Sequence, residues 1–333
     1  MTTVQQRFRA FASTEVLVLG DVMLDAYLWG RVDRISPEAP VPVVHVQERS
    51  ARLGGAANVA LNLHALGARP TVMTLLGDDE HAVRLAQLFG GLGLPTQGLL
   101  RSPRRRTTVK TRIISGHQHI VRVDEEDDHD LTDDDSERLL AAVQEHIRRA
   151  RPGAIVFEDY DKGVLTGPFI REVVRTARAE GIPTAVDPKK RNFMAYQDTD
   201  LFKPNLKELR EGLRMEVRAD DPEQLRRAAK ALENALGNRL TLLTLSEHGV
   251  LVHGGTEHHL IPAHVRSIAD VSGAGDTVIA VATLLLAQGA PVRTLAAWAN
   301  LAGGLVCEHV GVVPIDRERL MAECAALPET DRA

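Results

Sequence analysis

Short apolar runs alternate with longer amphipathic stretches along most of this chain. The first run covers residues 15–19 and ends in Gly20 and Asp21, a pattern typical of a buried strand whose C-terminal end presents a carboxylate. Similar runs recur at 71–76, 154–157, 183–186 and 241–245, and helix-like stretches cover 56–66, 133–150, 168–180, 222–236 and 276–288. Repeated strand–helix alternation predicts an α/β fold with a doubly wound, largely parallel sheet.

An acidic run at 124–135 contains the clearest helix start. Thr132 is placed as an N-cap, three aspartates follow in the first turn, and apolar residues recur at Leu139, Leu140, Val143 and Ile147 on one face. The earlier part of the run, 124–130, lacks the glycine of a calcium loop. We therefore predict a solvated connector at 124–130, followed by a capped helix.

Two segments interrupt the α/β pattern. Residues 41–47 follow the proline-marked sequence ISPEAPVP, and residues 107–123 alternate around Ser115-Gly116, so both read as exposed β-ribbons. The small sheet that they form must bury its apolar face on something. A lid over an active site and a twofold partner are the two interpretations.

Composition excludes several classes of protein. The 333 residues are 44% apolar and 26% charged, which suits one large α/β domain or two modest ones. No apolar stretch reaches the roughly 20 residues that span a bilayer, and the N-terminus has no basic region followed by an apolar one. We expect a cytoplasmic protein with no membrane partner. Cys307 and Cys324 have no CxxC pairing, so neither a disulfide framework nor a zinc ribbon is indicated.

The charge is distributed unevenly. The net charge is -5, but residues 124–135 hold nine acids, and the rest of the chain carries about +4. A body of this sign suits negatively charged small ligands. The basic run at 104–106 has few aromatic neighbours, so nucleic-acid binding is not expected.

The strongest local motif is DVSGAGDT at 270–277, which opens an apolar helix. Unpaired backbone N–H groups of Gly273, Ala274 and Gly275, together with the helix dipole, predict an anion site for a phosphoryl group. Asp276 lies beside it as a candidate base. The alternative is a packing turn before a core helix. The motif is neither a Walker loop nor a GxGxxG fingerprint.

Two weaker motifs point to ligands of other kinds. LGGAAN at 53–58 brings small residues and the donor and acceptor of Asn58 to a helix start, which suits a polyol, although helix packing explains it equally. KPNLKE at 203–208 puts Asn205 and Glu208 on one side of a helix turn, which suits a hydrated magnesium ion. A plain N-cap with Glu at its third position is the alternative.

The order of these motifs resembles the ribokinase-like (PfkB) carbohydrate kinases over nearly the whole chain. GDxxxD at 20–25, GGAAN at 54–58, NxxE at 205–208 and DxxGAGD at 270–276 carry the resemblance. It implies a three-layer αβα sandwich with a mostly parallel central sheet and a small β-sheet lid. We expect one kinase domain over 13–328, with lid segments at about 24–50 and 105–124.

Within that family the chain is similar to the kinases of ADP-heptose synthesis. ISPEAPVPVV at 35–44, DYDKG at 159–163 and VDPK at 186–189 carry this similarity. It implies ATP-dependent, magnesium-assisted phosphorylation of D-glycero-β-D-manno-heptose 7-phosphate at its anomeric hydroxyl, giving the 1,7-bisphosphate for lipopolysaccharide-core precursors. Three features depart from the pattern: Glu158 and Asp161 replace smaller neutral residues, and Lys189-Lys190-Arg191 is more basic than the usual DPKG.

The resemblance also assigns roles to individual residues. Asp276 becomes the general base, with Gly273, Ala274 and Gly275 as its anion hole. The ATP site takes Asn205, Leu206, Lys207, Glu208, Thr244, Ser246, Gly249 and Asn300, with magnesium held through water by Asn205 and Glu208. The sugar site takes Asp21, Gly54, Gly55 and Asn58, and we nominate Lys162, Lys189 and Arg122 for the substrate's own phosphate.

Several expectations concern what accompanies the kinase. Many relatives are fused to a nucleotidyltransferase with an HxGH motif, which does not occur here, so we expect the bisphosphate and not the ADP-sugar. A homodimer through the lid is expected, and a monovalent cation near Asp270 and Val310-Gly311 stays open. The rival functions are a kinase of another sugar or sugar phosphate and a non-catalytic sugar-binding regulator.

Overall fold

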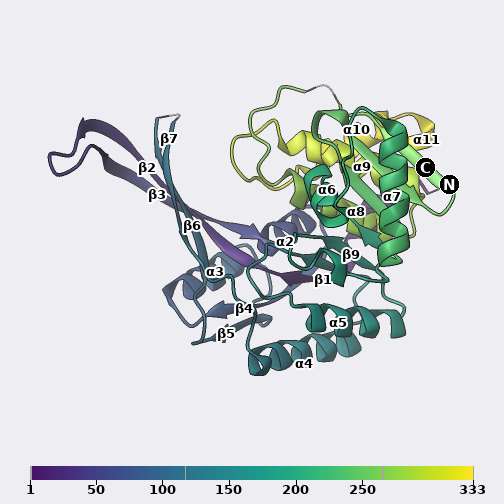
Figure 1. The fold of residues 1–333 in the computed structure, drawn as a ribbon, viewed down its shortest axis with the longest axis horizontal. Coiled ribbons are helices and arrows are strands. Elements are labelled where there is room, and N and C mark those ends of the chain that lie inside the picture. Colours follow the sequence, from purple (N-terminus) through teal and green to yellow (C-terminus); the bar gives the residue numbers. More distant parts are fainter. Residues whose placement is uncertain (1, 117, 265, 333) are drawn as a thin grey trace.

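A nine-stranded sheet forms the centre of the computed structural model, which describes residues 2–116, 118–264 and 266–332 (Figure 1). Its order is β13-β12-β11-β10-β9-β8-β1-β4-β5. The strands are β1 (Glu15–Gly20), β4 (Arg69–Gly77), β5 (Leu99–Ser102), β8 (Ala154–Glu158), β9 (Thr184–Asp187), β10 (Leu201–Phe202), β11 (Leu240–Thr244), β12 (Val250–Gly254) and β13 (Glu257–Ile261). All neighbours pair in parallel except at β12 and β13, so the predicted doubly wound, mostly parallel sheet is confirmed.

Helices cover both faces of this sheet and divide the core into two parts. One part packs under α1 (Val4–Phe11), α2 (Ala56–Ala65), α3 (Glu80–Gly91), α8 (Ala274–Ala287), α9 (Val292–Val306) and α10 (Arg317–Ala326). The other packs under α4 (Asp133–Ala150), α5 (Gly167–Ala179), α6 (Leu206–Leu213) and α7 (Pro222–Leu236), and a short α11 (Glu329–Arg332) ends the described chain.

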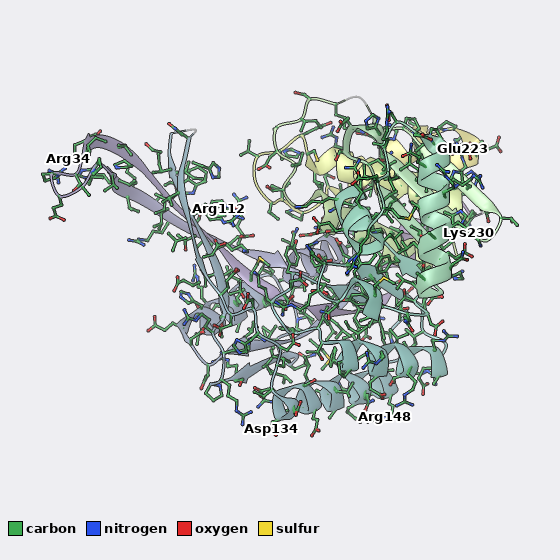
Figure 2. The ribbon with its side chains drawn as sticks, viewed as in Figure 1. Arg34, Arg112, Asp134, Arg148, Glu223 and Lys230 are labelled. Carbon is green, nitrogen blue, oxygen red and sulfur yellow. The ribbon has the colours of Figure 1, made fainter. Side chains whose placement is uncertain are left out.

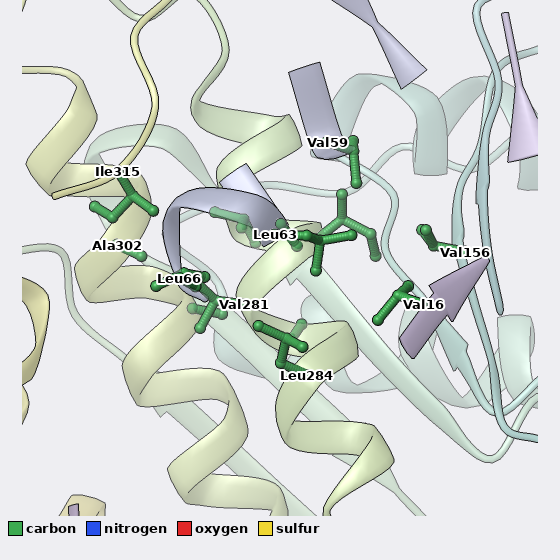
Figure 3. Packing of buried hydrophobic residues seen from close by; sticks show 14 of the residues in the cluster. Val16, Val59, Leu63, Leu66, Val156, Val281, Leu284, Ala302 and Ile315 are labelled. Atoms are coloured by element: carbon green, nitrogen blue, oxygen red, sulfur yellow. The ribbon is translucent and has the colours of Figure 1, made fainter. Parts of the chain in front are cut away.

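Alternation along the strands explains the two cores. Val16 of β1 points to the first core and Leu17 to the second, because successive side chains of a strand face opposite ways. Figure 3 shows Val16 and Val156 of the sheet beside Leu63 of α2 and Leu284 of α8. Helix α8 is buried along almost its whole length, as its apolar sequence predicts. Every helix in the described ranges lacks either the length or the apolar character that crossing a bilayer requires.

A separate four-stranded sheet, which we call the lid, extends away from the body (Figure 1). Its order is β3-β2-β6-β7, formed by β2 (Val22–Ile35), β3 (Pro42–Gly55), β6 (Thr108–Ser115) and β7 (Gln118–Glu125). Arg34 marks its far end in Figure 2. The predicted β-ribbons are therefore confirmed, and both are longer or better paired than the sequence pattern indicated. The lid leaves Ile35, Val41, Val46, Val121 and Val123 exposed.

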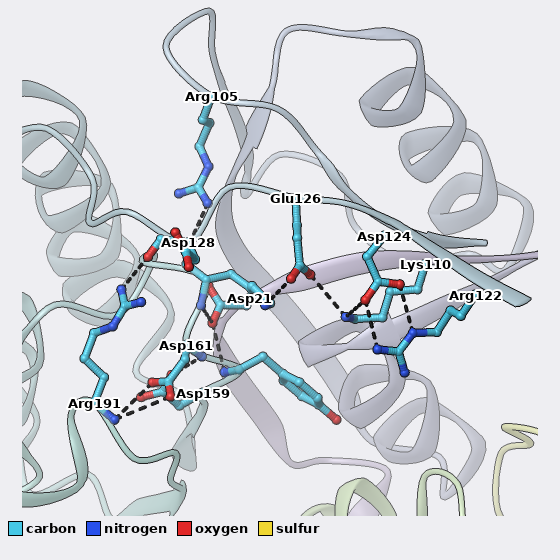
Figure 4. Close-up of polar contacts among 12 residues, drawn as sticks. Asp21, Arg105, Lys110, Arg122, Asp124, Glu126, Asp128, Asp159, Asp161 and Arg191 are labelled. Atoms are coloured by element: carbon cyan, nitrogen blue, oxygen red, sulfur yellow. Dashed lines mark hydrogen bonds and ion pairs between the residues drawn. The ribbon is translucent and has the colours of Figure 1, made fainter. Parts of the chain in front are cut away.

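The acidic run divides near the predicted boundary, and its first part is mostly exposed, as predicted, but is also held by ion pairs. Asp124 pairs with Arg122 at 2.9 Å and with Lys110 at 3.4 Å, and Glu126 bridges Lys110 and Lys162 at 3.1 and 2.7 Å (Figure 4). Two further pairs are Arg106–Asp127 and Arg191–Asp130. The segment crosses the base of the lid, where basic residues from three chain segments meet it.

The second part of the acidic run behaves as predicted. Helix α4 covers 133–150, and the hydroxyl of Thr132 accepts the backbone N–H of Asp135 at 3.3 Å. Three aspartates lie in its first turn. Both cysteines are buried free thiols, in agreement with the absence of CxxC pairing.

Candidate active site

The predicted catalytic residues meet where the carboxyl ends of β1, β8 and β9 face the N-terminus of α8. Ligands of open α/β sheets bind at this edge, because loops there are free to vary while the strands hold them in place. Asp276 lies in the first turn of α8, and Asp187 ends β9. Asn58 comes from α2, more than two hundred residues earlier in the chain than Asp276.

Asp276 is buried and held by two neutral donors. Its Oδ2 accepts a hydrogen bond from Nδ2 of Asn58 at 2.6 Å, and its Oδ1 accepts one from the hydroxyl of Tyr160 at 3.0 Å. Burial raises the pKa of Asp276 to about 6, with a further contribution from the Asp187 charge, although both hydrogen bonds act in the opposite direction. A carboxylate with a pKa near neutrality is suited to accept a proton from a hydroxyl group.

The structure changes the predicted set of free amides at the N-terminus of α8, because the N–H of Ala274 donates to the carbonyl of Val271 at 3.3 Å. Gly273 occupies the N-cap at φ 80°, a left-handed conformation that favours glycine, and no side chain caps the helix. A Cβ on Gly275 would lie 3.6 Å from both Nζ of Lys203 and Oδ2 of Asp187. Backbone amides, a helix dipole and a lysine therefore converge beside Asp276, which is an arrangement that suits a phosphoryl group.

Two lysines accompany the carboxylates of the site. Lys203 is buried, and its Nζ lies 2.8 Å from Oδ2 of Asp187. Lys189 lies 3.8 Å from Oδ1 of Asp187, 3.0 Å from Oε1 of Glu208 and 5.1 Å from the centre of the Tyr160 ring. Burial alone would lower the pKa of both lysines, but the carboxylate neighbours raise it, so both ammonium groups stay charged.

The NxxE segment forms a capping box at the start of α6. Oδ1 of Asn205 accepts the N–H of Glu208 at 2.9 Å, and Oε2 of Glu208 accepts the N–H of Asn205 at 2.8 Å. The alternative interpretation of this segment, an N-cap at Asn205 with Glu208 at the third position, is therefore confirmed. Leu206 and Lys207 follow in the first turn, where the Lys207 side chain is largely exposed.

The expected nucleotide loop lies between β11 and β12. Thr244 ends β11 and bridges to Asn205, which joins the loop to the NxxE segment. Ser246 adopts φ 53°, a left-handed conformation that favours glycine. Gly249, at φ 88°, packs too closely on Ala263 to carry a side chain. Asn300 is bound to the carbonyl of Pro262 at 2.9 Å.

The residues predicted to bind the sugar lie at the base of the lid. Asp21 is buried, and its carboxylate accepts the backbone N–H groups of Tyr160, Lys162 and Val164 at 2.9, 3.1 and 3.2 Å. It therefore holds the DYDKG loop in place. Gly55 has φ 61° and Gly54 packs directly on Asp25, so both glycines allow β3 to pass close to β2.

The three cations nominated for a substrate phosphate are all paired with carboxylates. Lys162 binds Glu126, Arg122 binds Asp124 out on the lid, and Lys189 binds Glu208 at the opposite, nucleotide end. The structure therefore brings only Lys189 next to the catalytic carboxylates.

Sequence reasoning missed several residues of the site. Arg52 and Arg112 contact the Tyr27 ring, with guanidinium carbons 5.4 and 5.5 Å from its centre, and Arg112 also binds Asp25. Alternation along the lid strands could have placed these side chains on one face. The Tyr160 hydroxyl was also missed. Lys203 lies in the KPNLKE motif, but the sequence analysis assigned it no function.

Comparison with known proteins shows the family to which this chain belongs. The family model described as pfkB family carbohydrate kinase matches residues 13–318, and the chain belongs to this family. It is 44% identical to the bifunctional protein HldE of Caulobacter vibrioides and 39% identical to that of Desulfatibacillum aliphaticivorans, over 96% of this chain in both cases. The chain spans 65% and 64% of the length of these two relatives.

Solved structures confirm the ribokinase-like fold. Phosphofructokinase-2 from Escherichia coli, crystallised in complex with potassium, superposes with a TM-score of 0.74 at 19% identity, covering 93% of this chain and 98% of that one. Ribokinase from Arabidopsis thaliana, complexed with ribose and ATP, gives a TM-score of 0.71 at 18% identity over 92% and 98% of the two chains. At these identities the likeness concerns the fold alone.

Proposed function

We propose that this chain transfers the γ-phosphoryl group of ATP to the anomeric hydroxyl of D-glycero-β-D-manno-heptose 7-phosphate, forming the 1,7-bisphosphate used to make ADP-heptose. The observation that carries the kinase assignment is Asp276, held by Asn58 and Tyr160 beside the uncapped N-terminus of α8. The sugar assignment rests on the ISPEAPVPVV, DYDKG and VDPK motifs and on the similarity to HldE proteins.

The chain's own residues divide the reaction between them. Asp276 accepts the proton of the attacking hydroxyl while the new bond forms to the γ-phosphorus and the bond to the leaving ADP oxygen breaks. Amides of Gly273 and Gly275, with Lys203 nearby, stabilise the charge that develops on the transferred group. Lys189 lies where it can bridge the nucleotide end and the catalytic carboxylates.

The NxxE segment can hold a magnesium ion only through water molecules. One oxygen of Glu208 serves the capping box and the other accepts from Lys189, so Asn205 and Glu208 would hold the ion through water molecules. When bound, magnesium neutralises charge on the ATP phosphates. Leu206, Lys207, Thr244, Ser246, Gly249 and Asn300 complete the proposed ATP site. Comparing the activity in potassium salts with that in sodium salts tests whether a monovalent cation binds near Asp270 and Gly311.

We assign the binding of the substrate's own phosphate to Arg52 and Arg112 in place of Lys162 and Arg122. Arg52 and Arg112 lie on the lid beside Asp25, which packs on Gly54 of the proposed sugar site. Two guanidinium groups at this end suit the phosphate that the substrate already carries, because arginine binds phosphate in a bidentate manner. This placement supports a sugar phosphate over a neutral sugar.

The lid also supports a homodimer. Its exposed apolar residues, among them Val46, Val121 and Val123, present a sheet face that a second copy would cover. We propose one kinase domain over 13–328, which pairs through the lid and works in the cytoplasm where ATP is available. Sedimentation of the intact chain and of a variant with Val121→Lys and Val123→Lys tests the dimer.

The substrate assignment is tested by a coupled ADP-release assay. We expect turnover with the heptose 7-phosphate and little or none with fructose 6-phosphate, ribose or the unphosphorylated heptose. Turnover with another sugar alone would reject the heptose assignment and keep the kinase. Sugar binding without ADP release on any member of the panel would favour a non-catalytic regulator.

A further inference from the structure

Glu158 is a buried acid without a hydrogen-bond partner. Its side chain is 0% exposed at the end of β8, and among the described residues neither carboxylate oxygen meets a donor. An ionised carboxylate is strongly disfavoured in such surroundings, and the group takes up a proton instead. The proposed reaction gives Glu158 no role.

The position of Glu158 beside two other acids favours the same protonated form. Oxygens of Glu158, Asp187 and Asp276 lie within 4.8 Å of one another, and all three side chains are buried. Like charges at this spacing in a buried site raise one another's pKa, so the acid with the fewest stabilising partners keeps a proton.

The contacts of the three acids show which one this is. Asp187 pairs with two ammonium groups, and Asp276 accepts two hydrogen bonds that favour its charged form. Glu158 has neither an ion pair nor a hydrogen bond among the described residues. The proton therefore belongs on Glu158, and Asp276 stays free to act as the base.

The titratable groups that act on Glu158 come from the elements packed against the end of β8. They are Asp187 of β9, Asp276 of α8, Lys189 after β9, Lys203 after β10 and Tyr160 after β8 itself. Helix α2 contributes the neutral amide of Asn58, and Asp21, after β1, directs its carboxylate to backbone N–H groups. Burial, and then the charges of the two aspartates, raise the pKa of Glu158 well above its ordinary range, although the lysines act in the opposite direction.

We propose that Glu158 is a neutral carboxylic acid in the resting enzyme, and that its proton limits the negative charge that a phosphoryl group meets beside Asp276. The site then contains the carboxylates of Asp187, Asp276 and Glu208 and the ammonium groups of Lys189 and Lys203, with a net charge of -1. Ionised Glu158 would make this charge -2 and repel the phosphoryl group more strongly. Glu158 is thus a positioning residue that acts through the charge of the site. This role rests on the proposed kinase function, whereas the protonation of Glu158 does not.

The pH dependence of stability tests the proton on Glu158. The folded protein keeps this proton above roughly pH 4.3, where the unfolded chain loses it, so the stability of the wild type falls as the pH rises. Glu158→Gln has no proton to lose. The unfolding constant of the wild type divided by that of Glu158→Gln should therefore rise about tenfold per pH unit, as urea denaturation between about pH 5 and pH 8 would show. Glu145→Gln, with an exposed side chain on α4, is the matched control, and its ratio to the wild type should stay constant.

Infrared spectroscopy gives a second measurement on the wild type alone. At pH 7 the spectrum should contain the C=O stretch of one protonated carboxyl group that moves when the protein is labelled with ¹³C-glutamate. This label excludes Asp159 and Asp276, whose pKa values are raised to about 7 and about 6. A ratio of unfolding constants that does not change with pH, or the lack of this band, would overturn the proposal. The band decides the matter if Glu158→Gln does not fold.

The role of this proton in catalysis is measured separately. Ionisation of Glu158 should lower the kcat/KM of the wild type and of Glu145→Gln at high pH, and the alkaline limb of Glu158→Gln should lie about one pH unit or more higher. An alkaline limb that is the same in all three proteins, or loss of turnover by Glu158→Gln at every pH, would overturn the electrostatic role. Failure to phosphorylate any sugar would reject the proposed function instead, and the unfolding and infrared results would still decide whether Glu158 holds a proton.

Discussion

Two groups of acids in this molecule have opposite surroundings. In the connector at 124–130, partial burial alone would raise the pKa of Glu126, but hydrogen bonds and charges from Lys162 and Lys110 lower it. At the end of β8 and in α8, burial raises the pKa of Glu158 and of Asp276. The cationic partners of Glu126 favour its charged form, so this residue serves as an anchor. The pKa of Asp276, raised to about 6, is close to neutrality, which suits proton transfer.

The largest expected effect comes from removing the base of the buried group. Asp276→Asn keeps the hydrogen-bond geometry with Asn58 nearly intact but cannot accept a proton, so kcat should fall on the order of 10²- to 10⁴-fold or more. ATP affinity, measured by calorimetry, should stay within a few fold. Asp124→Asn, in the connector, is the control and should keep near-normal turnover. Near-normal turnover of Asp276→Asn would refute the base assignment.

The pH dependence of catalysis sharpens the same contrast. Asp276 must be deprotonated to act as a base, so kcat/KM should fall tenfold per pH unit below about pH 6, its raised pKa. The Tyr160 hydroxyl stabilises the carboxylate form and lowers this pKa. Tyr160→Phe should therefore move the acidic limb to higher pH, as rate measurements between pH 5 and 8 would reveal. An unmoved limb would mean that another group controls it.

A smaller effect is expected at the end of the acidic run. Thr132→Ala removes the side-chain cap of α4 and should lower the free energy of unfolding by about 1 kcal/mol. Urea denaturation measures the change, and Thr132→Ser, which keeps the hydroxyl, should restore most of it. Equal losses for both variants would show that the methyl group, and not the cap, stabilises this turn.

The smallest effect should come from the connector itself. Glu126→Gln breaks partly exposed pairs with Lys110 and Lys162, which contribute roughly 0.2–1 kcal/mol each. The loss in unfolding free energy should shrink as salt screens the pairs. A double-mutant cycle with Lys162→Met isolates one pair. A loss of several kcal/mol that is insensitive to salt would place Glu126 with the buried acids instead.

Local signals in the sequence account for the elements that were predicted best. Helices α4 and α7 begin at the predicted residues because Thr132 and Asp221 supply side-chain caps. Helix α9 escaped prediction because it is buried on most sides and its N-cap, Pro291, makes no side-chain hydrogen bond. Helix α8 also lacks a side-chain cap and an amphipathic face, but the glycine-rich motif at 270–277 marks its start, and α9 has no such motif.

The candidate site was predictable to the extent that its motifs are local. Asp276, Asn58 and the glycines of α8 each lie in a short recognisable pattern. The hydroxyl of Tyr160 reaches Asp276 across 116 positions of the chain, and the Lys203–Asp187 pair joins two strands. Contacts of this kind follow from packing, which no short pattern records.

One stretch of chain joins the lid to the base. Strand β3 ends at Gly55, α2 begins at Ala56, and Asn58 follows within its first turn, where it binds Asp276. A shift of the lid strand that reaches Gly55 also shifts Asn58, and with it a hydrogen bond that lowers the pKa of the base. The lid strand and the surroundings of Asp276 are thus joined by a few residues of chain, and a change at Gly55 is transmitted to the hydrogen bond of Asn58.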